Sequence, residues 1–173
     1  GAVGVGIAQS GGTVSLTSTL VADNTITLAP LGGLQQQDVV RMGGTLLAQF
    51  AGTNNVDGVR NLIEFGVSPS ALCREGDGYY GIAIDSTALH VAAWRACHDV
   101  VKELIARGTP VDALDGLGGT GLQLAIKACV DSFWAERRKP DSVKALLEAG
   151  ASLDSVELPT GYDELDAILR GAQ

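Results

Sequence analysis

Residue types that carry catalytic or redox chemistry are scarce in this chain of 173 residues. It has two histidines and three cysteines, and aromatic residues make up 5% of it. Cys73, Cys97 and Cys129 are widely separated and form no C-x-x-C pair, which favours reduced thiols over a disulfide framework. Because the histidine and cysteine side chains are so few and so scattered, we expect no metal site and no other cofactor.

The chain also lacks a long apolar run and an excess of basic residues. No stretch reaches the roughly eighteen apolar residues that would cross a bilayer. The net charge of −8 disfavours nonspecific binding to nucleic acid or to anionic lipid. Residues 1–8 are apolar but too short for a signal peptide and lack a basic leader, although a signal peptide already removed would leave no trace. We therefore expect no membrane or nucleic-acid partner, and the scattered cysteines favour a cytoplasmic setting.

Charge is nearly absent from residues 1–33, where Asp23 is the only charged residue and Gly, Ser and Thr dominate. Partial alternation of apolar and polar residues in 13–21 and 25–28, around a turn at 22–24, is typical of a β-hairpin. A flexible arm fits the same composition. An isolated hairpin is marginal in water, so an ordered arm needs a surface to pack on or another chain to pair with. Both interpretations stay open, and we place a domain boundary after residue 33.

Residues 86–113 contain two apolar runs at helical spacing, one directly after the other. Thr87 can cap the first helix, because its hydroxyl accepts a backbone N–H, and Gly108 is a typical helix end. The apolar faces are Leu89, Ala92 and Ala93 in the first run and Val100, Val101, Leu104 and Ile105 in the second. Two short helices so close in sequence lie antiparallel, and neither buries enough apolar surface without neighbours.

The same unit recurs along the chain. Three glycines end its second helix, at intervals of 42 residues: Gly66, Gly108 and Gly150. Its first helix begins each time at a threonine: Thr45, Thr87 and Thr120. These intervals fit a basic unit of about 33 residues with two nine-residue insertions, in 70–85 and 130–139. We therefore expect repeats at about 43–71, 72–113 and 114–154, and a truncated cap at 155–173 that shields the open end.

The sequence predicts the helices of the first and third repeats in more detail. Before and within the first repeat, we expect a short helix at 34–42, a turn at Gly43–Gly44, and helices at 45–51 and 56–64. In the third repeat, the insertion predicts a first helix that is longer by about two turns and is broken at Pro140. The aromatic residues of this insertion are expected to pack on the helices, and its basic residues to stay solvated.

Residues 87–93, with the sequence TALHVAA, resemble the T-P-L-H-x-A-A helix signature of the ankyrin-repeat family. Residues 108–120 resemble the turn between two such repeats, and 150–154 repeat its opening. The resemblance covers about 43–170. It implies a mainly α-helical solenoid of antiparallel helix pairs with hairpin-like turns. The sequence departs from the family pattern at Ala88 and Gly121 in place of proline, and at Ala48 and Gln123 in place of histidine.

The resemblance also implies structural roles for several residues. His90 holds the position whose side chain ties adjacent turns together, and the structural turn positions are Thr87, Gly108, Thr120 and Gly150. His98 and Cys97, in the turn between two helices, form no catalytic pair, because sequence neighbours in a turn rarely direct their side chains at one another. We infer no active site and predict that the chain is not an enzyme.

In this family, the hairpin tips and the outward positions of the first helices form the recognition surface. By register, the candidate partner-binding residues are Trp94, Arg95, Lys127, Leu114 and Leu117, with Tyr79 and Tyr80 in the first insertion. Trp, Tyr and Arg are enriched at the centres of protein interfaces. The alternatives are that Trp94 packs against a neighbouring helix and that one tyrosine covers the base of its own loop.

Two functions follow from these patterns. The first is non-catalytic binding of another protein through the concave face and hairpin tips of the array. The second is self-assembly, in which the uncharged arm of residues 1–33 pairs with a neighbouring subunit. The composition break near residue 34 motivates the second interpretation, and the outward Trp94 and Arg95 motivate the first.

Overall fold

A computed structural model describes residues 9–10, 13–14, 36–76, 82–132 and 135–172. The helices in this part of the chain are α1 (Gln36–Gly52), α2 (Val56–Glu64), α3 (Ala88–Trp94), α4 (His98–Ala106), α5 (Gly121–Asp131), α6 (Asp141–Glu148), α7 (Asp163–Gly171) and a short 3₁₀ helix, η1 (Ala135–Arg137). Two antiparallel strand pairs accompany them: β1 (Gln9–Ser10) with β2 (Thr13–Val14), and β3 (Leu72–Cys73) with β4 (Ser86–Thr87).

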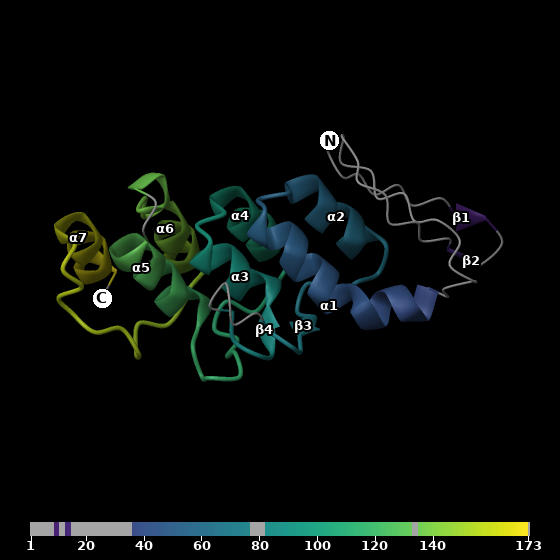
Figure 1. Ribbon diagram of the computed structural model, residues 1–173. Helices are drawn as coiled ribbons and strands as arrows, with labels where there is room; N and C mark the ends of the chain where they lie inside the picture. Colours follow the sequence, from purple (N-terminus) through teal and green to yellow (C-terminus); the bar gives the residue numbers. More distant parts are fainter. Residues whose placement is uncertain (1–8, 11–12, 15–35, 77–81, 133–134, 173) are drawn as a thin grey trace.

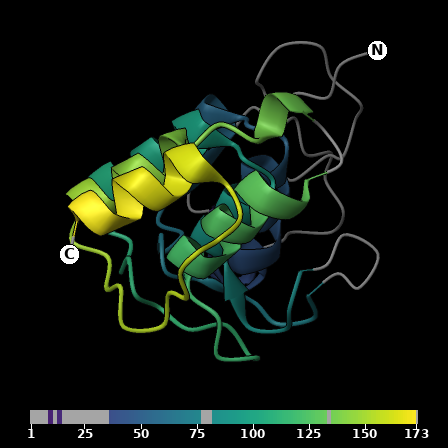
Figure 2. The same ribbon diagram turned by 90° about the vertical axis from the view of Figure 1, so that its left-hand side faces the viewer.

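The helices stand in two layers (Figure 1). We name α1, α3 and α5 the inner helices, since they follow one another in one layer, and α2, α4 and α6 the outer helices. Each inner helix packs on the outer helix that follows it in sequence. The strands β3 and β4 and the long turns lie along one edge of the array, and α7 closes its C-terminal end, which faces the viewer in Figure 2. The predicted solenoid of helix pairs is confirmed.

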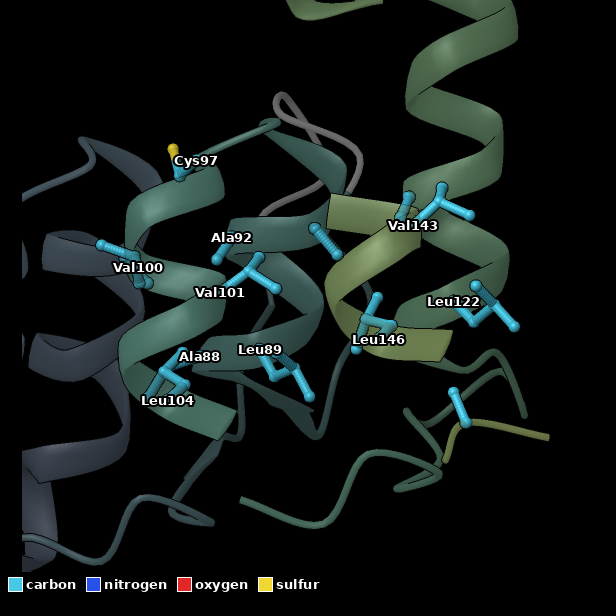
Figure 3. Close-up of a cluster of buried hydrophobic side chains, with 14 of the residues drawn as sticks. Ala88, Leu89, Ala92, Cys97, Val100, Val101, Leu104, Leu122, Val143 and Leu146 are labelled. Atoms are coloured by element: carbon cyan, nitrogen blue, oxygen red, sulfur yellow. The ribbon is translucent and has the colours of Figure 1, made fainter. Parts of the chain in front are cut away.

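One continuous apolar core runs through the array. Its buried residues extend from Leu47 in α1 to Leu169 in α7. Figure 3 shows how three helices contribute to its centre, with Leu89 from α3, Leu122 from α5 and Leu146 from α6. Full burial of such a side chain is worth about 1.5–3 kcal/mol of transfer free energy. The stack therefore gains from shared burial what a single helix pair cannot supply.

The three outer helices end in the same way. Gly66, Gly108 and Gly150 follow them with φ angles of 111°, 80° and 87°. The N–H of each glycine donates to the carbonyl three residues earlier, and the next N–H donates to the carbonyl five residues earlier. A residue with a Cβ costs about 1–2 kcal/mol in this left-handed conformation, which explains the glycines. These helix ends are the ones that the sequence predicts.

The predicted turn at Gly43–Gly44 is wrong. The helix α1 runs unbroken from Gln36 to Gly52, whereas the sequence suggested two helices on either side of these glycines. Their role is close packing: a Cβ on Gly43 would lie 2.5 Å from Val67 Cγ1, and a Cβ on Gly44 would overlap the backbone carbonyl of Leu72. The glycines thus let the turn after α2 and the strand β3 pack directly on α1.

The third repeat is extended less than expected. The helix α5 has 11 residues and α3 has 7, so the extension is about one turn rather than two. It stops because Ser132 takes an extended conformation, with ψ of 129°. The chain continues through η1 to Pro140, which caps α6. Phe133 and Trp134, the aromatic residues of this insertion, lie outside the described residues.

The structure describes the C-terminal end of the chain but little of residues 1–33. At the C-terminus, α7 is the single short helix that the sequence predicts, with Leu165 and Leu169 buried in the core. In the N-terminal arm, the hairpin predicted around 22–24 lies outside the described residues. The pairing that the structure describes there joins β1 to β2, with Gln9 opposite Val14.

Leu104 gives a direct test of the stacked core. It is fully buried in α4, so Leu104→Ala should lower the free energy of unfolding by about 2–5 kcal/mol, as measured by urea denaturation. Leu117→Ala is the matched control, because Leu117 is 83% exposed and lies outside the core. Similar losses for the two variants would contradict this account of the core.

Candidate partner-binding face

His90 connects α3 to the turn that leads into the next repeat. Its Nδ1 accepts the backbone N–H of Thr87 at 3.1 Å, and its Nε2 lies 2.9 Å from the carbonyl oxygen of Ala113 and 3.1 Å from that of Gly119. Since Nδ1 accepts from an amide, the proton is assigned to Nε2, which donates to the carbonyls. The neutral imidazole thus fixes the turn to the inner helix that precedes it.

Gln123 makes the same kind of connection one repeat later. Its Oε1 accepts the backbone N–H of Thr120 at 2.9 Å, and its Nε2 donates to the carbonyl oxygen of Ser155 at 3.1 Å. The amide oxygen therefore takes the place of Nδ1, and the amide nitrogen that of Nε2. Ala48 holds the equivalent position in α1, where a methyl group can form neither bond. The first repeat lacks this side-chain bridge.

Trp94 and Lys127 meet across neighbouring inner helices. The ammonium of Lys127, in α5, lies 5.4 Å from the centroid of the Trp94 ring, which is a cation–π contact. Trp94 is the last residue of α3 and Arg95 is its C-cap; both are half-buried, whereas Lys127 is exposed. We refer to these three residues as the Trp94 cluster. The family resemblance implied outward positions for all three, and the structure brings two of them into contact.

Leu114 and Leu117 lie on the turn that leads into α5, and they are 62% and 83% exposed. The buried carboxylate of Asp115 holds this turn, because its Oδ1 accepts the N–H of Leu117 at 2.9 Å and that of Gly119 at 2.8 Å. An isolated β-bridge also joins Leu114 to Thr120. The two leucines are therefore presented to solvent on a backbone that is already fixed.

Ile84 extends this exposed apolar edge toward the preceding repeat. It is 52% exposed, and its carbonyl accepts the N–H of Gly116 at 2.8 Å. A Cβ on Gly116 would lie 2.6 Å from Ile84 Cγ1, so glycine permits the close approach of the two turns. We name Ile84, Leu114 and Leu117 the apolar turn edge. The sequence did not reveal Ile84, because it lies within the first insertion (70–85), for which the repeat pattern provides no register.

The remaining predicted residues divide into two groups. Thr87 and Thr120 are N-caps with extended backbones before α3 and α5, and Gly108 and Gly150 follow the outer helices. Tyr79 and Tyr80, predicted as further contacts, lie outside the described residues, as does most of the arm of residues 1–33. The candidate face is therefore built from the Trp94 cluster and the apolar turn edge.

The position of His98 differs from the one that the sequence predicts. It is the first residue of α4 rather than a turn residue, and it is half-buried, with its Nδ1 2.7 Å from Ser142 Oγ in α6. Burial lowers the pKa of this imidazole. Periodicity could not reveal the contact, because the two residues are 44 positions apart and only stacking of the second and third repeats joins them.

The described residues offer little for nucleophilic or metal chemistry. Burial raises the pKa of Cys97, and it raises that of Cys129 to about 11, so both are protonated thiols at neutral pH. In the part of the chain that the structure describes, no three His, Cys, Asp or Glu side chains gather where they could hold a metal ion. Nor does any helix in that part have the length and apolar character to cross a bilayer.

Comparison with known proteins agrees with this geometry. Residues 85–116, which include α3, α4 and much of the turn before α5, match the family model of the ankyrin repeat. This match and the relatives described next support a relationship to the ankyrin-repeat family. A protein of Rickettsia bellii (strain RML369-C), whose name describes it as an ankyrin repeat protein, is 34% identical to it over 125 residues, or 63% of this chain and 48% of that protein.

A second relative is named as a protein kinase. Serine/threonine-protein kinase 12 of Arabidopsis thaliana is 36% identical over 84 residues, or 49% of this chain and 16% of the kinase. The chain thus spans about half of the first relative and about a sixth of the second. Such a small share of the kinase carries no argument for catalysis, and ankyrin-repeat proteins are typically not enzymes.

The environment of His90 predicts how stability depends on pH. Burial is the main cause that lowers its pKa below the ordinary value of 6.5, although the Asp115 carboxylate and the hydrogen bonds to the carbonyls of Gly119 and Ala113 act in the opposite direction. The unfolded chain therefore binds a proton here at higher pH than the folded chain does. We expect the free energy of unfolding to fall as the pH drops below about 6.5, until the lower pKa of the folded state is reached.

Replacing His90 by glutamine tests this prediction, because Gln123 shows that an amide can make both hydrogen bonds. His90→Gln should keep most of the stability at about pH 8 and should be less sensitive to acid, as measured by urea denaturation at a series of pH values. His90→Ala should lose about 1–3 kcal/mol, since the buried Thr87 amide is left without its acceptor. Identical pH profiles for the wild type and His90→Gln would rule out the assigned role.

Proposed function

We propose that this chain binds another protein through the inner face of its repeat array. Ankyrin repeats are generally protein–protein interaction modules. The observation that carries the proposal is the contact between Trp94 and Lys127 across α3 and α5. It holds a large aromatic ring against the Lys127 ammonium before any partner arrives, and tryptophan is among the residues that dominate interface energetics.

The apolar turn edge supports the same face. Asp115 fixes the backbone that carries Leu117, so little conformational entropy is lost when a partner covers this side chain. The turns lie at the edge from which the inner helices start (Figure 1). The seven residues of α3 separate this edge from the Trp94 cluster, which corresponds to about 10 Å along the helix axis. One extended or helical segment of a partner can therefore cover both features.

Alanine substitution in the Trp94 cluster tests the proposal. A partner is first isolated from native lysate with the full chain, and its affinity is then measured by titration calorimetry. Trp94→Ala and Lys127→Ala should each weaken binding by about 1 kcal/mol or more, because each removes a side chain from the centre of the proposed face. Lys102→Ala is the matched control, since Lys102 is an exposed lysine on the outer helix α4. Unchanged affinity for both variants, with the fold intact, would exclude this face.

A further inference from the structure

The first repeat contains a groove at the position where the later repeats carry a bridging side chain. His90 and Gln123 reach the turn that follows their helix pair, whereas α1 carries Ala48 at that position. A groove of about 320 Å³ lies beside Ala48, between α1, α3 and the turn that contains β3. Its floor is a small apolar cluster, separate from the main core, of Ala48, Cys73 and Val91 with Ile82 packed against it.

The wall of the groove carries a positive charge, whereas its floor is apolar. Among the described residues that line it, Arg95 alone carries a charge, and the exposed Gln49 lies on its rim. This cation belongs to a face that is less acidic than the opposite side of the array. With their C-caps, α3 and α5 carry two basic residues and one acidic residue, whereas α2, α4 and α6 carry four basic and six acidic residues. A negatively charged segment is therefore directed toward the inner helices rather than the outer ones.

We propose that the groove binds a short segment of the partner protein in which an aliphatic side chain stands next to a carboxylate. The aliphatic group covers the floor formed by Ala48, Cys73 and Val91, and the carboxylate faces Arg95. The volume is at the lower end of known ligand pockets, which suits one or two side chains rather than a whole helix face. The apolar floor provides affinity and the guanidinium fixes orientation.

This inference rests on the proposed function, because it names the chemistry of the partner at the same inner face. It also gives the departure from the repeat pattern at Ala48 a role in binding. A histidine or glutamine at this position would extend into the space above the floor, because His90 and Gln123 extend far enough in the other repeats to reach turn carbonyls. The absence of that side chain is what leaves the groove open.

A displayed library of random peptides, about twelve residues long and selected on the full chain, is the probe. We expect the enriched peptides to share an aliphatic residue beside Asp or Glu. Synthetic peptides with these sequences should bind the wild type at least about tenfold more tightly than Ala48→His, because the imidazole fills the groove. Ala106→His is the matched control, since Ala106 is exposed on the outer helix α4, and it should bind like the wild type.

Two further measurements keep the test independent of any single variant. Gln49→Tyr covers the groove from an exposed position of α1 and should weaken the peptides even where Ala48→His fails to fold by circular dichroism. Replacement of the peptide's acid by its amide should weaken binding at least about fivefold, because it removes the charge opposite Arg95.

Several outcomes would overturn the inference. These are enriched peptides without acids, peptides that bind the groove-filled variants as well as the wild type, and a selection that yields no peptide able to distinguish them. Purely apolar peptides would indicate a second copy of the chain or an apolar partner, and would also overturn it. A partner weakened by Trp94→Ala but not by Ala48→His or Gln49→Tyr would remove the groove from the account and leave the proposed function standing.

Discussion

Burial of apolar surface between neighbouring helix pairs is the constraint on which this structure depends. The helix α3 has seven residues, and helices of this length are not stable alone in water. They persist because one core runs from α1 to α7 and every repeat shares it with its neighbours. The same stacking decides which side chains meet on the surface. Trp94 lies beside Lys127 because α3 and α5 pack on each other at a fixed register.

Polar contacts fix the relative positions of neighbouring elements, which apolar burial alone does not determine. On the inner side, His90 and Gln123 attach an inner helix to the turn that follows the next outer helix. On the outer side, Glu103 of α4 accepts from Arg60 of α2 at 3.2 Å and from Arg107 at 2.9 Å. These ion pairs are only partly covered from solvent, and such pairs contribute little stability, so we assign them an orienting role. The outer ion pairs join the first two repeats, and Ala48 leaves the first repeat without the inner bridge.

The sequence predicted what depends on local pattern. The bounds of α2 and the glycine helix ends follow from periodicity, and the structure agrees. The sequence could not predict contacts that form only when the repeats stack. The helix through Gly43–Gly44 depends on the approach of Val67 and Leu72, which no local pattern encodes. The pairing of His98 with Ser142 likewise depends on the packing of α4 on α6.

The central claim is that stacking builds a single inner face on which a partner docks. Hydrogen–deuterium exchange of the full chain, alone and with its isolated partner, tests this claim most directly. The account predicts slower exchange in the complex over the turn at 113–120 and over the C-terminal halves of α3 and α5, which carry Trp94 and Lys127, with α2, α4 and α6 unchanged. Added protection confined to the outer helices would contradict it.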